Sequence, residues 1–444
     1  MISSELIISV GIIENAQEVC GIFNGYFEFS SSIKLRGSFR VTNKDRRLVL
    51  YDDEDVEVLR SEELYCRSLS NATFTLSDVT IGLNFHWERK EKQTFEGDLK
   101  IQLNADGTLS VINKIDIELY LKSVISSEIS AEAPIELLKA HAITSRSWLV
   151  AMLERQQRFR NIGVHVQQSL ETVDEIIRWY DREDHAFFDV CADDHCQRYQ
   201  GITKIISDSA KEAVEATRGI FLVADNEVCD ARFSKVCGGR TELFENCWDE
   251  TPIPYLQSIS DSSINYLPIL SEADAEHWIT SSPDVYCNTT DGKMLQHVLP
   301  SFDQETADFF RWKVEYSCDQ LEEILFAKSG IDFGMVMDIV PMKRGPSGRI
   351  VKLKIIGSKR TIIVGKELEI RRWLSKSHLY SSAFIVKIER DGKGVPMKFV
   401  FHGAGWGHGV GLCQIGAAVM ASKGFTAEEI VKHYFKDAEL KKLY

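Results

Sequence analysis

The chain has 444 residues, of which 44% are hydrophobic and 27% charged, a balance typical of folded globular proteins rather than disordered or fibrous ones. Its formal net charge of −14 argues against nucleic acid or anionic lipid as the main partner, because both need clustered Lys and Arg. No run of about 18 apolar residues occurs, so no membrane span is expected. The ten cysteines are too sparse for a disulfide scaffold, and most are expected to be small buried side chains.

The first 113 residues have the pattern of short β-strands broken by Gly, Asn and Asp. The alternation of Leu6, Ile8, Val10 and Ile12 predicts a strand, and no basic segment of the kind found in a signal peptide precedes it. The stretch 95–113 predicts a hairpin with its turn at Asn104-Ala105-Asp106-Gly107.

Two helices are expected after this β-rich region. Asp116 is placed to cap the first helix, on which Leu121, Ile125 and Glu128 share one face. Packing of that apolar face desolvates the carboxyl group of Glu128 and raises its pKa, which suits a general acid. The alternative is a glutamate at the edge of the core that pairs with an arginine.

The second helix begins after Ala133-Pro134 and extends to about Arg155. Arg146 lies in line with its apolar residues, as Glu128 does on the first helix. Its guanidinium group offers a fork of donors for a substrate oxygen. A salt bridge that fixes the two helices is the alternative interpretation.

The remaining chain predicts a helix near 208–217, helical pieces within 265–330, paired strands in 349–357 and 360–365, and a helix from 368. The segment 185–196 holds His185, Cys191, His195 and Cys196 within twelve residues, and thiolate and imidazole ligands suit zinc. Three protein ligands plus water would resemble a catalytic site, four ligands a closed structural one, and chance clustering is the alternative.

A glycine-rich segment, HGAGWGHGVGLCQIGA, occupies residues 402–417 and leads into a predicted helix. Alternating glycines indicate that backbone approaches a ligand or another strand closely, although a tight structural corner explains them equally well. The phosphate-loop pattern GxxxxGK[ST] is absent from it. His402, His408 and Gln414 are the polar groups on or beside this loop, and Trp406 either stacks on a sugar ring or packs below the loop.

Two long motifs resemble those of the SpoIID/LytB family. The segment YLKSVISSEISAEAPIELLKAHAITSRSW is similar to the family pattern YLxxVVxxEMPxxWPxEALKAQAxAARTY. GAGWGHGVGLCQIGAAVMASKG is similar to the closing pattern GxGWGHGVGMSQxGAxxMAxxG, and IVKHYF to the following ILxHYY. CADDHCQRYQG and FSKVCGGRTELFENCW resemble two shorter family segments that lie between them. The resemblance covers roughly residues 95–260 and 310–440.

The resemblance implies a peptidoglycan substrate and a catalytic glutamate at Glu128. It also implies a structural zinc held by His185, Cys191 and Cys196, with His195 the candidate for a fourth ligand. Arg146, His402, Trp406, His408 and Gln414 are then the predicted substrate-binding residues. Departures from the family pattern, which alter the predicted subsite, are His141, Ser145, Ser147 and Trp148.

The expected activity is that of a lytic transglycosylase, which cleaves the bond between N-acetylmuramic acid and N-acetylglucosamine and leaves 1,6-anhydro ends. One carboxyl group acts as acid and then as base, unlike the carboxylate pair of ordinary glycosidases. The alternative is a non-catalytic, glycan-binding enhancer of a cell-wall amidase. A zinc amidase is a weaker third interpretation, because two thiolates reduce the Lewis acidity of the metal.

The expected fold class is α+β, with an antiparallel β-rich body, a helical pair at the active cleft and a smaller inserted lobe. The expected parts are an N-terminal β-rich region at 1–95, a first core segment at 96–264, the inserted lobe at 265–312, and a second core segment with the glycine-rich loop at 313–444. Glycan strands as substrate favour the cell envelope, whereas the lack of an evident signal peptide keeps the cytoplasm open.

Overall fold

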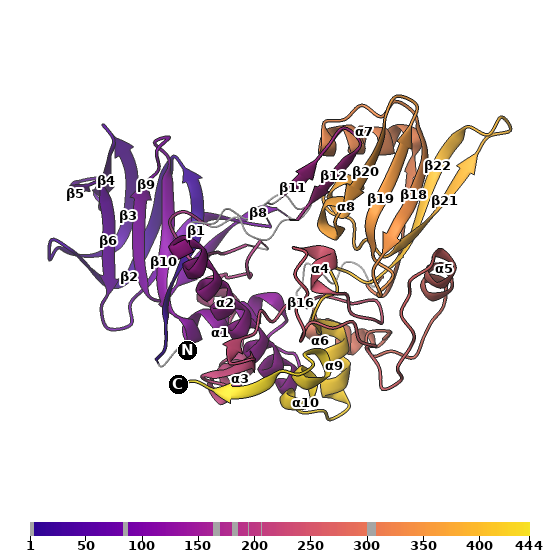
Figure 1. Cartoon of the computed structure of the whole chain (residues 1–444). Helices are drawn as coiled ribbons and strands as arrows, with labels where there is room; N and C mark the ends of the chain where they lie inside the picture. The colour runs from indigo at the N-terminus through magenta and orange to yellow at the C-terminus, as the bar shows by residue number, and fades with distance from the viewer. Residues whose placement is uncertain are drawn as a thin grey trace. The chain divides into compact units, whose positions relative to one another are not determined.

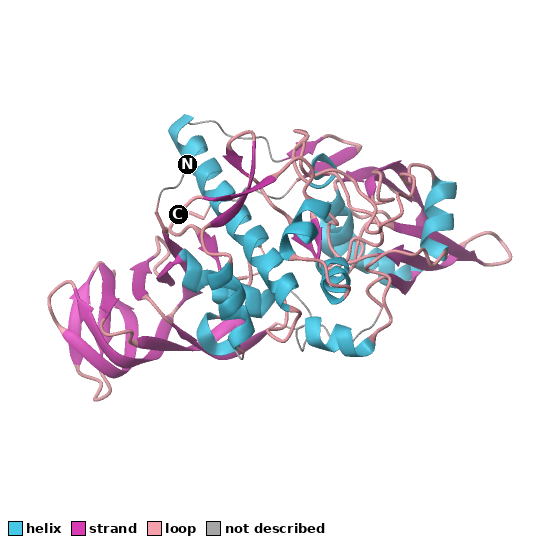
Figure 2. Cartoon of the chain, turned by 90° about the horizontal axis from the view of Figure 1, so that it is seen from below, coloured by secondary structure: helices cyan, strands magenta, loops and turns pink. Residues whose placement is uncertain are grey.

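The computed structural model describes residues 4–82, 88–162, 169–179, 185–193, 195–205, 207–299 and 308–444. Helices and strands are both abundant, and the largest sheet is mainly antiparallel, so the expected α+β class is confirmed (Figures 1 and 2). The chain divides into two compact units. Unit 1 comprises 1–142, 184–220 and 442–444, and unit 2 comprises 143–183 and 221–441. The four-part division expected from the sequence stays a prediction.

Unit 1 is built on an 11-stranded sheet that contains almost all strands of the N-terminal region (indigo to purple in Figure 1). Its core is rich in aromatic rings, among them Phe23 stacked on Phe39 with centroids 4.2 Å apart. The strands are β1 (Ile7–Ala16), β2 (Glu18–Phe29), β3 (Lys34–Lys44), β4 (Arg47–Tyr51), β5 (Glu57–Ser61), β6 (Glu63–Ser68), β7 (Thr73–Ile81), β8 (Arg89–Phe95), β9 (Asp98–Leu103), β10 (Leu109–Asp116) and β13 (Val190–Cys191).

Strands β9 and β10 form the hairpin predicted from the sequence. The Gly107 backbone N–H donates to the Asn104 carbonyl at 3.0 Å, and φ of +89° at Gly107 is the left-handed conformation that glycine adopts freely. Strand β13 pairs in parallel with β1, with Gly11 opposite Cys191. This pairing anchors the segment after residue 184 to the sheet.

The helices of unit 1 follow the hairpin directly. They are α1 (Ile117–Glu128), the first part of α2 (Ile135–Ile162), the 3-10 helix η1 (Gly201–Lys204) and α3 (Asp208–Ala216). Asp116 occupies the N-cap position of α1, but its side chain makes no capping hydrogen bond, so that part of the prediction is wrong. Helix α2 extends seven residues beyond its expected end at Arg155, because its sequence continues without Gly or Pro.

Unit 2 contains a five-stranded sheet of order β11-β12-β20-β19-β18 and a three-stranded sheet of order β17-β22-β21. The two predicted strands at 349–365 pair antiparallel as β19 and β20. The strands assigned to this part of the chain are β11 (Ser169–Glu171), β12 (Glu175–Arg178), β14 (Ile220–Ala224), β15 (Glu227–Val228), β16 (Phe233–Ser234), β17 (Arg311–Ser317), β18 (Val336–Arg344), β19 (Ile350–Gly357), β20 (Thr361–Gly365), β21 (Phe384–Arg390), β22 (Pro396–Ala404), β23 (Leu412–Cys413) and β24 (Glu439–Lys442).

The helices of unit 2 are mostly short. Ser317 and Gln320 form a capping box at the start of α7, and Gly330 ends that helix in the left-handed conformation. Helices α7 and α8 share one apolar core with strands β17 to β22. The helices are α4 (Phe244–Cys247), α5 (Glu272–Thr280), α6 (Gly292–Val298), α7 (Cys318–Ser329), α8 (Glu367–Trp373), α9 (Gln414–Ser422) and α10 (Ala427–Tyr434).

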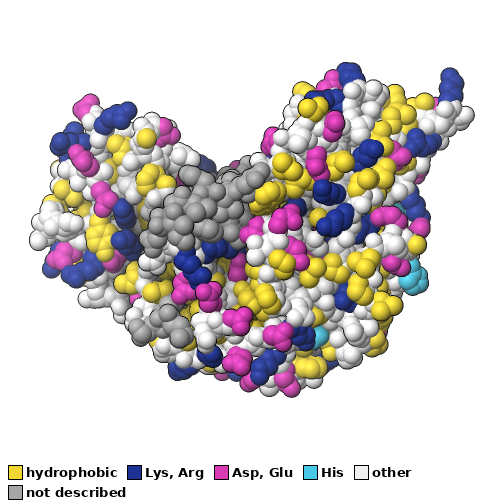
Figure 3. Space-filling view, in the orientation of Figure 1, with side chains coloured by type: hydrophobic (Ala, Val, Ile, Leu, Met, Phe, Trp, Pro, Cys, Tyr) yellow, Lys and Arg dark blue, Asp and Glu magenta, His cyan; other side chains and the backbone are white. Residues whose placement is uncertain are grey.

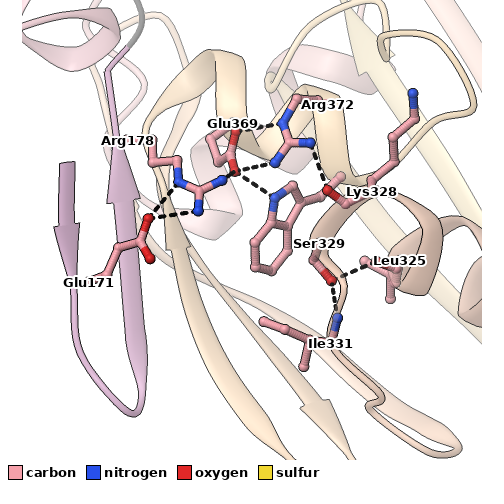
Figure 4. Close-up of polar contacts among 9 residues, drawn as sticks. Glu171, Arg178, Leu325, Lys328, Ser329, Ile331, Glu369 and Arg372 are labelled. Atoms are coloured by element: carbon pink, nitrogen blue, oxygen red, sulfur yellow. Dashed lines mark hydrogen bonds and ion pairs between the residues drawn. The ribbon is translucent and has the colours of Figure 1, made fainter. Parts of the chain in front are cut away.

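A buried carboxylate ties α8 to its neighbours (Figure 4). Glu369 has no accessible surface, and it accepts hydrogen bonds from Arg372 at 2.6 and 2.8 Å, from Arg178 at 3.2 Å and from the Trp373 indole at 2.7 Å. Arg372 also donates to the carbonyl of Lys328 at the end of α7. Because the charge is buried with its partners, loss of one partner is costly for folding.

The charged side chains are interspersed on the face drawn in Figure 3, where Lys and Arg alternate with Asp and Glu. Among the described residues, no helix is both long and apolar enough to cross a membrane.

Candidate functional site

Glu128 is the last residue of α1, in unit 1. Leu121 and Ile125 on the same face are fully buried, whereas Glu128 is half-buried, so the predicted apolar stripe ends at this carboxyl group. Its Oε1 atom accepts the backbone N–H of Arg198 at 2.9 Å. This main-chain donor fixes the direction of the carboxyl group.

The neighbouring acidic residues Glu118 and Glu132 have different surroundings. Glu118 is buried at the start of α1 and accepts from the Tyr444 hydroxyl at 2.6 Å and the Gly219 N–H at 3.3 Å. Ten residues of helix separate it from Glu128, or about 15 Å along the axis. Glu132 is exposed beyond the end of the helix. Glu118 therefore lies too far along the helix to form a catalytic pair with Glu128.

The segment that supplies the Arg198 N–H packs against α1 through polar contacts. The Tyr120 ring stacks on Tyr199 with centroids 5.1 Å apart, and the Tyr120 hydroxyl donates to Gln197 at 3.3 Å. The Ser123 hydroxyl accepts the Gln200 N–H at 3.1 Å. Burial raises the pKa of both tyrosines, so their hydroxyl groups stay neutral donors. Periodicity alone missed these residues; the CQRYQG motif was the available signal.

The four predicted metal-ligating residues lie together in unit 1. One donor atom from each of His185, Cys191, His195 and Cys196 lies within 4.8 Å of the others. His185 Nε2 is 3.3 Å and His195 Nδ1 3.5 Å from the Cys196 sulfur. Cys196 precedes Gln197 and Arg198, so this cluster adjoins the segment that binds Glu128.

The backbone around the cluster is built to hold these side chains. Cys191 ends strand β13 opposite Gly11, and the Phe188 ring lies 2.5 Å from the position that a Cβ atom at Gly11 would take. Hydrogen bonding by Cys196 and then by His185 and His195 lowers the pKa of the Cys191 thiol. A set of two sulfur and two imidazole donors at such separations fits a tetrahedral metal ion.

Arg146 is located in unit 2 on α2 and has no accessible surface. Because its guanidinium group is fully buried, a structural role in fixing the helix is favoured over direct contact with a sugar. The contact with substrate stays a prediction.

The glycine-rich loop belongs to unit 2 and packs against its own chain. Gly405, Gly407, Gly409 and Gly411 have φ values between +73° and +92°. The buried Arg349 donates to the Gly407 carbonyl at 2.9 and 3.2 Å, and its guanidinium occupies the space that a side chain at Gly409 would need. Close packing of the loop against its own chain therefore explains these glycines, as the structural interpretation expected.

The four predicted substrate-binding residues around this loop differ in exposure. Half-exposed His402 lies on β22, and half-exposed Trp406 packs on Phe309, with ring centroids 5.0 Å apart. His408 Nδ1 accepts the backbone N–H of Val410 at 3.0 Å, and burial lowers its pKa well below the usual value. Gln414 is buried at the start of α9. Glu128 belongs to unit 1 and this loop to unit 2, so their association in one cleft stays a prediction.

Comparison with known proteins identifies the relatives of these segments. Residues 105–223, which contain Glu128 and the His/Cys cluster, match the model of the Stage II sporulation protein family, SpoIID. Residues 242–411 match a domain of unknown function, DUF8618.

Three relatives illustrate the similarity along the chain. Stage II sporulation protein D of Bacillus amyloliquefaciens is 24% identical over 329 residues, 74% of this chain and 75% of that protein. An uncharacterized protein of Brachyspira hyodysenteriae is 25% identical over 333 residues, 75% of this chain and 68% of that protein. The amidase enhancer of Bacillus subtilis is 24% identical over 247 residues, 53% of this chain but 33% of that protein.

Proposed function

Because this chain belongs to the SpoIID/LytB family, we propose that it acts on cell-wall peptidoglycan as a lytic transglycosylase with Glu128 as the single general acid and base. The observation that carries the proposal is the half-buried carboxyl group at the end of α1, held by the Arg198 N–H inside the SpoIID segment. A main-chain donor of this kind fixes the direction in which the carboxyl group points, which a general acid requires.

The proposed reaction needs only one carboxyl group. Glu128 donates its proton to the glycosidic oxygen as the bond to C1 of N-acetylmuramic acid breaks, and the leaving sugar departs as an alcohol. The Glu128 carboxylate then removes the proton from the 6-hydroxyl of the same muramic acid, whose oxygen attacks C1. The carboxyl group is regenerated, and the product carries a 1,6-anhydro ring.

The absence of a partner carboxylate on α1 supports this route over hydrolysis. Inverting glycosidases place a second carboxylate about 6.5–9.5 Å from the acid, and retaining ones about 5–5.5 Å. Glu118 lies about 15 Å along the helix from Glu128 and is already hydrogen-bonded to Tyr444. An internal hydroxyl that is already in position replaces the activated water.

The His185, Cys191, His195 and Cys196 cluster is proposed to bind one zinc ion with a structural role. Four protein donors within 4.8 Å leave no position for a reactive water, which supports a closed site rather than a zinc amidase. A bound ion would fasten the segment that carries the Arg198 N–H to β13.

The other predicted substrate contacts remain part of the proposal. The half-exposed His402 and Trp406 are better placed to meet a ligand from solvent than the buried Arg146 and Gln414. A glycan-strand substrate places the working protein in the cell envelope, which is the proposed location.

The second candidate function is that of an enhancer of a cell-wall amidase without turnover of its own. The observation that favours it is the similarity to the amidase enhancer of Bacillus subtilis, although this chain covers only 33% of that protein. The presence of Glu128 at the end of the buried stripe favours the enzyme.

Mass spectrometry of purified glycan strands after incubation with the full chain tests the two functions. Borohydride reduction is applied to half of each sample, because anhydro ends resist it whereas hydrolysis products gain two hydrogens. Cleaved strands with unreduced ends support the transglycosylase. Wholly reducible products would indicate a hydrolase. Intact strands, together with stimulation of an added amidase, would indicate the enhancer.

A further inference from the structure

A second group of metal-ligating side chains lies in unit 2, separate from the His185 cluster. We name Cys237, Asp261, Cys287 and Cys413 the buried thiol cluster. One donor atom from each residue lies within 4.8 Å of the others, and all four side chains are at most 2% exposed. From these observations we propose that the cluster binds one zinc ion as a closed structural site.

The separations within the cluster match the geometry that zinc requires. Tetrahedral coordination at about 2.3 Å from each sulfur places two thiolates about 3.8 Å apart. The sulfur atoms of Cys237 and Cys287 are 3.7 Å apart. A disulfide needs a bond of about 2.05 Å and would leave Cys413 without a partner, so a metal explains three converging sulfurs better than a cross-link does.

The surroundings orient the donor atoms. The Asp261 carboxylate accepts the Tyr434 hydroxyl at 2.6 Å on one oxygen and the Cys287 N–H at 2.8 Å on the other. The Cys413 sulfur accepts the backbone N–H of Cys237 at 3.2 Å. Hydrogen bonds to ligating carboxylates and thiolates are the usual outer layer of a metal site.

The packing leaves little freedom for these groups. A Cβ atom at Gly416 would lie 2.5 Å from the Tyr434 hydroxyl and 2.3 and 2.6 Å from the two Asp261 carboxylate oxygens, so helix α9 approaches the cluster closely. Strand β23, which ends at Cys413, pairs in parallel with β16, three residues before Cys237. Four segments far apart in the sequence are therefore brought to one point by the fold.

The charge around the cluster also fits a metal–thiolate centre. Arg311 is half-buried, and its Nη atoms donate to the carbonyls of Gly238, Trp278 and Phe310 at 2.8–3.3 Å. Its buried Nε atom has no hydrogen-bond partner within the described part of the chain. A dication with three thiolates and a carboxylate carries net negative charge, which would balance the buried guanidinium.

Cys413 is a position at which this sequence departs from the pattern that its glycine-rich segment resembles. The family pattern has Ser in GMSQ where this sequence has Cys413. Full burial excludes an open position for water at the metal, so the ion would hold α9 and the loops before it together. The inference does not depend on glycan cleavage, because the site and the Glu128 carboxyl group are in different units.

Zinc content of the full chain, purified without added metal, tests the proposal by elemental analysis. The C191S/C196S variant, which removes the other cluster, should keep about one zinc per chain. The C287S variant should lose about one zinc relative to the unmodified protein. The matched control is C229S, which changes a fully buried cysteine of unit 2 outside the cluster and should lose none.

A second measurement on the unmodified protein keeps the test independent of how the variants fold. An anomalous-scattering map collected at the zinc edge should show a peak between the Cys237, Cys287 and Cys413 sulfurs. The proposal is overturned if that position carries no peak, if the C191S/C196S variant folds without zinc, or if the intact mass shows a disulfide in place of a metal.

Discussion

Replacement of Glu128 by glutamine separates chemistry from folding at the proposed active site. The amide keeps a carbonyl oxygen that still accepts the Arg198 N–H, which lies 2.9 Å from Oε1. The side chain is half-buried and keeps nearly the same shape, so the free energy of unfolding should change by less than about 1 kcal/mol. The proton needed by the leaving oxygen is lost, and general acids contribute about 10²–10⁴-fold to rate.

The expected loss corresponds to about 3–5 kcal/mol of transition-state stabilisation. We expect Glu128→Gln to abolish measurable release of anhydro ends from glycan strands, while its denaturant midpoint stays at that of the unmodified protein. Glu132→Gln is the matched control, because Glu132 is exposed four residues further along the chain and should keep full activity. Retention of more than a few per cent of activity by Glu128→Gln would show that another group supplies the proton.

Three further predictions test the surroundings of these sites. Glu369→Gln should lower the free energy of unfolding in denaturant by about 3 kcal/mol, because it breaks a buried ion network. Glu171→Gln changes an exposed partner of Arg178 and should cost under about 1 kcal/mol, and equal effects would contradict the role of burial. Burial lowers the pKa of His378 to about 4. Below pH 6.5 the unfolded chain therefore binds a proton at His378 that the folded chain does not bind, and the free energy of unfolding decreases as pH falls from 7 to 5. His378→Phe should reduce that loss by at most about 2 kcal/mol, and an unchanged pH profile would refute the assignment. His185→Ala should lower zinc content by up to one ion per chain, and unchanged content would remove His185 from the ligand set.

Local pattern in the sequence determined much of the secondary structure. The hairpin of β9 and β10, the β19–β20 pair and helices α1, α3 and α8 were predicted because their periodicity and turn residues act over a few neighbours. The His185 to Cys196 cluster was also predicted, since its four ligands lie within twelve residues and a short loop brings them together. Helical periodicity singled out Glu128 as a candidate acid, and the motif resemblance indicated its catalytic role.

Tertiary structure alone decided the contacts between distant segments. The donor to Glu128 is a backbone N–H seventy residues away, which carries no mark in the side-chain sequence. The buried thiol cluster collects residues from 237 to 413, and the same cysteines read singly were expected to be small apolar side chains. Asp116 occupies the cap position without capping, and Arg146 is fully buried, because the packing around each residue sets its partners. Sequence specifies short-range geometry, whereas ligand sets of this kind exist only after the chain has folded.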